Sequence, residues 1–304
     1  MYFRNLAFIH SYRITMKTLI NFCLIAVLGI AFASFSFADN TLTLDEAIAQ
    51  HKVQATMPPF GETGYSLGLR VDVKNISGKN LKLIMPKGTI FIPDDGGEQT
   101  LITNGDEAFA LNAGQTKQIV RPGFCTELHD HGSGEESTFK LGMTKNDKLK
   151  NVIGLMDSLK ITDHSTVQHA IWSVTDNNPI GYVDVEDTTK SRLLRERLVA
   201  LTGQPMPWYE TEAEIEQTPE REFVIVSKTV EGELSFYSKD AVNMQGFVKD
   251  STGAVVWTNP NKIVGAHGNV TFWYKLTVEG WDPGKYHVVY VDRGKEIINQ
   301  EFEL

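Results

Sequence analysis

Hydrophobic and polar residues alternate along much of residues 65–120, which is the spacing of β-strands with one buried face. The clearest stretch is 67–73, where Leu or Val stands at every second position. Strands are predicted over 65–73, 81–84, 89–92, 99–102, 108–111 and 116–120. Short strands separated by turn residues predict an antiparallel β-sandwich or open barrel.

A helical pattern replaces this alternation after a polar loop at 126–137. Apolar residues three and four apart predict helices over 148–160, 167–175 and 190–201, with a further short helix at 43–49. Asp147 is the expected N-cap of the first of these, and Thr43 with Glu46 forms an expected capping box. Gly203 is expected to end the last helix.

The period-two pattern returns from Glu222 to the end of the chain and predicts a compact Ig-like sandwich. Strands are expected at 223–226, 234–237, 244–248, 255–257, 270–276, 286–291 and 297–302. The acidic, Pro-containing segment 204–221 is the predicted linker. The fold class is therefore mostly β with helices (α+β): residues 39–203 form a sandwich or barrel with a three-helix cap, and residues 222–304 form the second sandwich.

The first 38 residues are typical of a cleavable signal peptide. Met16-Lys17 begins a basic segment, an apolar run follows, and Ser36-Phe37-Ala38 offers small residues before Asp39. The alternative is an uncleaved membrane anchor, because the run is nearly long enough to span a bilayer. We expect cleavage and export to the cell surface or medium, with no later segment able to cross a membrane.

Charge and cysteine content limit the partners of the exported chain. Removing Arg4, Arg13 and Lys17 from 29 basic residues leaves 26 against 38 acidic residues, a net charge of −12. This charge argues against nucleic acid and anionic lipid as partners.

Cleavage also removes Cys23 and leaves Cys125 as the one remaining thiol. A single cysteine cannot form an internal disulfide, so its presence in an exported chain suggests a chemical role.

Two segments together suggest a chemical role for Cys125. They are Gly123-Phe124-Cys125-Thr126, which ends the first group of strands, and Val167-Gln168-His169-Ala170-Ile171-Trp172, which opens a helix. Over residues 42–203 the chain resembles the bacterial thioester domain of surface adhesins, in which a Cys and the Gln of a T-Q-x-A-I/V-W box become covalently joined. Here Val167 replaces the Thr of that box, and the two residues are 43 apart, fewer than the family leads us to expect.

The resemblance implies an internal thioester between Cys125 and Gln168. The thiolate would attack the carboxamide and expel ammonia, which requires near-attack contact and hydrogen-bond donors for the oxyanion, such as a helix N-terminus. Trp172 lies one helical turn after Gln168 and is expected to shield the acyl group from water. A partner's amine or hydroxyl would then take the acyl group, which is single-use attachment and not enzymatic turnover. No cofactor is implied.

Structural explanations exist for each of these residues. Gln168 could close a capping box that begins at Ser165, Cys125 could be an inert core residue, and Trp172 could be core. The function would then be that of a non-covalent structural or carbohydrate-contacting surface module.

Nearby histidines leave two further alternatives open. His129 or His131 could act as a base for Cys125. The same pair with Cys125 could bind zinc, with Glu127, Asp130 or His164 as a fourth ligand. A Cys-His protease is a weaker alternative, because no orienting Asn or Asp is recognisable.

The C-terminal module resembles the sorting domains of type IX secretion. The resemblance rests on Asp250-Ser251-Thr252-Gly253 and Gly284-Lys285-Tyr286-His287-Val288, while the family's opening Pro-Asn-Pro is absent. Sorting, a spacer role and ligand binding stay open. The candidate binding patch consists of Trp257, Trp273, Tyr274 and Trp281.

Overall fold

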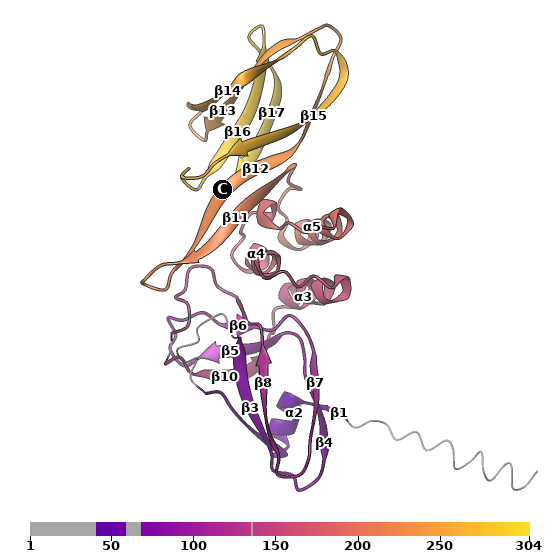
Figure 1. The fold of residues 1–304 in the computed structure, drawn as a ribbon, viewed down its shortest axis with the longest axis vertical. Helices are drawn as coiled ribbons and strands as arrows, with labels where there is room; N and C mark the ends of the chain where they lie inside the picture. Colours follow the sequence, from indigo (N-terminus) through magenta and orange to yellow (C-terminus); the bar gives the residue numbers. More distant parts are fainter. Residues whose placement is uncertain (1–40, 59–67, 135) are drawn as a thin grey trace, which may run out of the picture. The chain divides into compact units, whose positions relative to one another are not determined.

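The structure is a computed structural model that describes residues 41–58, 68–134 and 136–304 (Figure 1). The fold is mostly β with a helical segment, which confirms the predicted fold class. The predicted leader and the beginning of the first predicted strand, residues 65–67, lie outside the described residues. Within the described part of the chain, no helix combines the length and apolar character needed to cross a membrane.

The N-terminal strands form three small sheets with the orders β1-β4-β7, β2-β3-β8 and β10-β5-β6-β9. Alternation along β3 buries Leu69, Val71 and Val73, as the sequence pattern predicts. The strands are β1 (Thr41–Thr43), β2 (Val53–Thr56), β3 (Leu69–Asn75), β4 (Leu81–Met85), β5 (Thr89–Pro93), β6 (Leu101–Ile102), β7 (Glu107–Leu111), β8 (Thr116–Arg121), β9 (Phe124–Cys125) and β10 (Phe139–Met143).

Helices α3, α4 and α5 contribute apolar side chains to a shared core, which Ile102 and Phe124 of the sheet β10-β5-β6-β9 join. The residues of α4 from 166 to 173 are all buried, so this helix lies between neighbours on more than one side. The predicted Thr43–Glu46 capping box is present. The N-cap of α3 is Asn146 and not Asp147, because the Asn146 side chain accepts the N–H groups of residues 148 and 149. The helical elements are α2 (Leu44–Ala49), α3 (Asp147–Leu159), α4 (His164–Thr175), the 3-10 turn η2 (Ile180–Tyr182) and α5 (Thr188–Thr202), which ends at left-handed Gly203.

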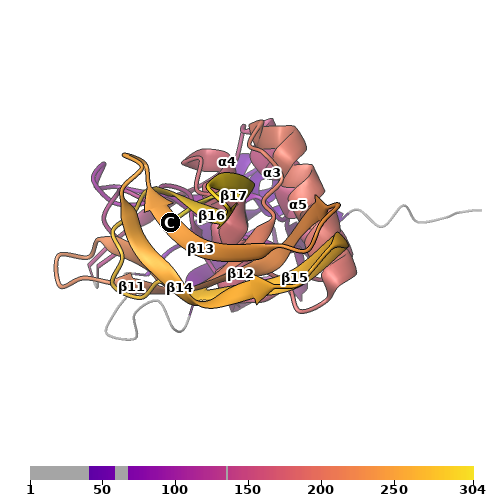
Figure 2. The same cartoon turned by 90° about the horizontal axis from the view of Figure 1, so that it is seen from above.

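The C-terminal strands form a two-sheet sandwich with the antiparallel orders β11-β12-β15 and β14-β13-β16-β17, and β12 and β15 run side by side in Figure 2. One apolar core fills it, as expected for an Ig-like sandwich. The strands are β11 (Tyr209–Gln217), β12 (Phe223–Ser238), β13 (Asn243–Asp250), β14 (Val255–Val264), β15 (Gly268–Thr277), β16 (Lys285–Asp292) and β17 (Lys295–Glu303).

The segment expected as a linker contains strand β11, which pairs with β12. The acidic residues stand at every second position and are exposed apart from the half-buried Glu210, while Tyr209 and Thr211 are buried on the other face. Strand β12 is continuous over 16 residues where two shorter strands were predicted. Its first residues, including Phe223 and Ile225, pack against the N-terminal core. The hairpin β11–β12 therefore belongs to both cores, and the division into separate domains stays a prediction.

A substitution at Gly232 tests how tightly this hairpin is packed. A Cβ on Gly232 would lie 2.4 Å from the Trp208 carbonyl oxygen and 3.0 Å from the Tyr209 Cα, both backbone atoms that cannot move alone. We expect Gly232→Ala to lower the free energy of unfolding by about 2 kcal/mol. The control is Gly154→Ala in α3, where nothing lies within 4 Å; it should raise stability by about 0.5–1 kcal/mol. Urea unfolding measures both, and equal effects would contradict the packing described.

Candidate functional site

Cys125 and Gln168 come from different elements that the fold places against each other. Cys125 ends β9, the edge strand of the sheet β10-β5-β6-β9, and Gln168 lies in the second turn of α4. Asp163 is the N-cap of α4, because its carboxylate accepts the Thr166 N–H at 2.8 Å. The alternative capping box from Ser165 to Gln168 is therefore not formed, and the Gln168 side chain is available to face β9.

The Gln168 carboxamide makes two hydrogen bonds to the backbone of residue 125. The Cys125 N–H donates to Gln168 Oε1 at 2.9 Å, and Gln168 Nε2 donates to the Cys125 carbonyl oxygen at 2.8 Å. Only 1% of Cys125 and 2% of Gln168 are exposed. The structure thus places the Gln168 carboxamide against the backbone of Cys125, with both residues buried.

These two bonds fix the orientation of the amide. Its oxygen already points at a backbone donor, the group that would stabilise negative charge on that oxygen if the carbonyl carbon were attacked. A helix N-terminus was the expected source of such a donor, but here the donor is the N–H of Cys125 itself. The same bonds also satisfy a buried sheet edge that would otherwise lack partners.

Trp172 is completely buried and belongs to the same apolar core as Cys125. Its ring lies 6.1 Å from the ring of Phe223, at the start of β12. The hairpin that carries Phe223 is held in place by an Arg221–Glu98 ion pair at 2.9 Å and by the Gly132 N–H, which donates to the Arg221 carbonyl oxygen at 2.7 Å. A hairpin from the C-terminal half therefore covers the outer side of Trp172.

His169, the residue after Gln168, is also buried, although no role is predicted for it from the sequence. Its ring stacks on Tyr182 at 5.2 Å and its Nδ1 lies 3.3 Å from the Asn178 amide nitrogen. Burial lowers the pKa of His169 to about 4, although the Asp163 charge opposes this shift. The imidazole is therefore neutral at pH 7. The sequence feature that could have pointed to His169 is its position inside the Gln-x-Ala-Ile-Trp box.

The predicted loop histidines lie elsewhere. His129 and His131 are exposed, in contrast to the buried Cys125–Gln168 contact. No three His, Cys, Asp or Glu residues of the described segments come together as a metal site, so the alternative zinc ligands are not assembled. The His164 ring instead packs against the Phe124 ring in a tilted arrangement, with ring centroids 4.9 Å apart, and burial lowers the pKa of His164.

Glu127 lies two residues beyond Cys125 and is partly enclosed. Its carboxylate accepts the Thr126 hydroxyl at 2.6 Å and the Thr100 N–H at 2.8 Å. Burial raises the pKa of this carboxyl, while the two hydrogen bonds lower it. Glu127 thus fixes the loop that follows β9, a positional role that the sequence did not indicate.

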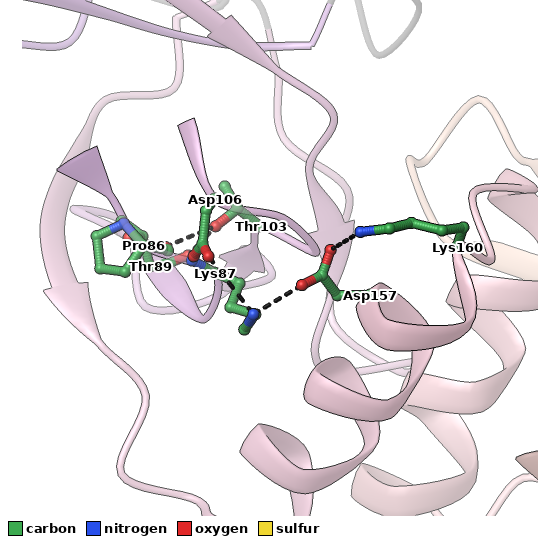
Figure 3. Close-up of polar contacts among 7 residues, drawn as sticks. All are labelled: Pro86, Lys87, Thr89, Thr103, Asp106, Asp157 and Lys160. Atoms are coloured by element: carbon green, nitrogen blue, oxygen red, sulfur yellow. Dashed lines mark hydrogen bonds and ion pairs between the residues drawn. The ribbon is translucent and has the colours of Figure 1, made fainter. Parts of the chain in front are cut away.

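An ion-pair cluster fastens α3 to the strands (Figure 3). Lys87, between β4 and β5, lies 2.7 Å from Asp157 and 3.5 Å from Asp106, and Asp157 also pairs with Lys160 at 3.5 Å. The hydrogen bond from Lys87 lowers the pKa of Asp157. A cavity of about 370 Å³ lies beside this cluster, with Phe124 in its wall. These contacts help to hold the helices against the sheet that carries Cys125.

Comparisons with known proteins give no functional assignment. A scan against protein-family models and a search of curated proteins each found no match. Among solved structures, a β-glucosidase from Kluyveromyces marxianus is 9% identical, with a TM-score of 0.18. The match covers 78% of this chain and 44% of that one, so this chain spans less than half of the enzyme's length. A similarity this weak supports no inference about either fold or activity.

The buried imidazole gives a testable pH dependence. The pKa of His169 falls from 6.5 to about 4 on folding, so the unfolded chain binds a proton more readily. The contribution of His169 to the free energy of unfolding is therefore greatest well above pH 6.5. It decreases by about 3 kcal/mol as the pH falls to 4. His169→Gln should lose less stability than the parent protein between pH 7 and pH 4 in urea unfolding.

The control for that measurement is His267→Gln, which removes an exposed imidazole. A pH dependence of His169→Gln identical to that of the parent protein would show that His169 is not the titrating group.

Proposed function

We propose that this chain is an exported or surface-attached protein in which Cys125 and Gln168 form an internal thioester that acylates an amine or hydroxyl of a partner. One observation carries the proposal: the Gln168 carboxamide is hydrogen-bonded to the backbone of Cys125 at 2.9 and 2.8 Å, and both residues are buried. The aromatic-Cys and Gln-x-Ala-Ile-Trp segments are the independent sequence support.

The chemistry follows from this seating. The Cys125 thiol gives up its proton, and the sulfur attacks Cδ of Gln168 while the Cys125 N–H donates to the developing oxyanion. The C–N bond then breaks, and the nitrogen leaves with the thiol proton as ammonia. A partner amine later attacks the same carbon, the C–S bond breaks, and sulfur regains a proton. Each protein molecule reacts once.

An acyl link of this kind persists only where water is excluded. Trp172 has no exposed surface, and Phe223 from the hairpin covers it. These two rings are the proposed shield. The proposal gives no role to His129 and His131, because both side chains are exposed while the Cys–Gln contact is buried.

A second candidate is a non-covalent surface module with an inert Cys125. Gln168 would then serve only to satisfy the buried edge of β9. An exposed aromatic pair favours this candidate: Trp273 is 62% and Tyr237 68% exposed on the sheet β11-β12-β15. The register of β12 against β15 puts both side chains on the same face of the sheet. Aromatic rings on such a face can stack on a sugar.

Intact mass distinguishes the two candidates. The purified exported chain should be lighter than its sequence by the mass of one ammonia, about 17 Da, and methylamine should add about 31 Da. Cys125→Ala should show neither change, because it lacks the nucleophile. A parent protein with an unmodified mass and no methylamine uptake would refute the thioester and leave the second candidate.

Phe223→Ala tests the shield. Removing this ring should expose Trp172 and let water reach the acyl carbon, so the rate of spontaneous hydrolysis should rise at least several-fold. Hydrolysis adds about 18 Da and frees a thiol, which mass spectrometry and thiol labelling follow in time. Val224→Ala changes an exposed neighbour and is the matched control. Equal hydrolysis rates in both variants would exclude Phe223 as part of the shield.

A further inference from the structure

The outer face of strands β12 and β15, which run side by side (Figure 2), carries two aromatic rings that do not pack in the core. Tyr237 is 68% exposed and Trp273 is 62% exposed. The strand register pairs Trp273 with Glu233 and Tyr237 with Asn269, so these four side chains share one face of the sheet. Rings of this size are normally buried, so their exposure is informative.

Hydrogen-bonding side chains fill the space between the two rings. Ser235 and Thr271 are direct partners halfway along this stretch, and both are exposed. Together with Glu233 and Asn269 they offer hydroxyl, carboxylate and amide groups, which donate and accept hydrogen bonds. We call the six residues 233, 235, 237, 269, 271 and 273 the outer β12–β15 face.

The composition of the outer β12–β15 face indicates the kind of partner. None of its six residues is aliphatic, whereas lipid surfaces and the centres of protein interfaces call for contiguous apolar area. A sugar ring has an apolar C–H face and a rim of hydroxyls. The C–H face can stack on Trp273 or Tyr237, and the hydroxyls can bond to the polar side chains between them.

The Trp273 ring is held in position before any ligand arrives. Its Nε1 donates to the Glu231 carboxylate at 3.4 Å, and Lys275 pairs with the same carboxylate at 3.0 Å. A ring that is already oriented loses little conformational entropy on binding. The ion pair also neutralises the charge of Glu231 beside the ring.

The spacing of the rings sets the size of the ligand. Tyr237 lies four residues along β12 from Glu233, the partner of Trp273, which is about 14 Å along the strands. A single sugar unit cannot contact both rings, but an extended oligosaccharide can. The exposed Glu233 and the net negative charge of the chain disfavour an acidic polysaccharide.

We propose that the outer β12–β15 face is a binding platform for an extended neutral oligosaccharide, with Trp273 and Tyr237 as its two stacking subsites. The inference gives the second candidate function a defined site and ligand class. It does not rest on the thioester, since none of these residues takes part in the Cys125–Gln168 contact.

The test titrates the full exported chain by calorimetry with neutral hexasaccharides of glucose, xylose and N-acetylglucosamine, their disaccharides, and an acidic hexagalacturonate. At least one neutral hexasaccharide should bind saturably, about tenfold more tightly than its disaccharide, because only the longer chain reaches both rings. Binding should change little with salt, and the acidic chain should not bind. Cys125→Ala should bind as the parent does. Absence of glycan binding would not alter the ammonia loss expected of the parent, so the two proposals fail independently.

Variants locate the binding. Trp273→Ala and Tyr237→Ala should each weaken hexasaccharide binding about tenfold, and Trp273→Phe, which keeps a ring, should lose less. The matched control is Val264→Ala, which shortens a 69% exposed side chain on β14 of the other sheet and should leave affinity unchanged. Circular dichroism verifies that each variant is folded. No saturable binding of any neutral glycan, equal affinity for disaccharide and hexasaccharide, or equal affinity of Trp273→Ala and Val264→Ala would overturn the proposal.

Discussion

The reciprocal pair of hydrogen bonds between the Gln168 carboxamide and the backbone of Cys125 joins the two halves of the N-terminal unit. Strand β9 is a short edge strand, so its backbone groups need partners from outside the sheet. Helix α4 supplies them through one side chain. The contact therefore serves packing and, under the proposed function, also places an electrophile beside the residue that carries the only thiol of the described chain.

Much of the fold could be predicted from local patterns. The alternation in β3, the capping box at Thr43 and the glycine at the end of α5 are signals carried by neighbouring residues, and each appears as expected. Strand β11 was missed because its glutamates resemble a solvated linker. Only pairing with β12, a non-local interaction, makes that segment a strand.

The candidate site was predictable in its residues but not in its geometry. The sequence indicated Cys125, Gln168 and Trp172, but it left open whether Gln168 closes a capping box that begins at Ser165. The choice of Asp163 decides that Gln168 faces the sheet and does not cap the helix. The cover from Phe223 and the burial of His169 depend on contacts between distant segments, so no local pattern carries them.

The continuity of β12 has a mechanical consequence. One strand of 16 residues packs at its beginning on the N-terminal core and at its end in the C-terminal sandwich. Tension applied to the C-terminal sandwich is therefore transmitted along a single hydrogen-bonded strand to the ring that lies over Trp172. A force that displaces this strand would therefore also shift the ring that covers Trp172.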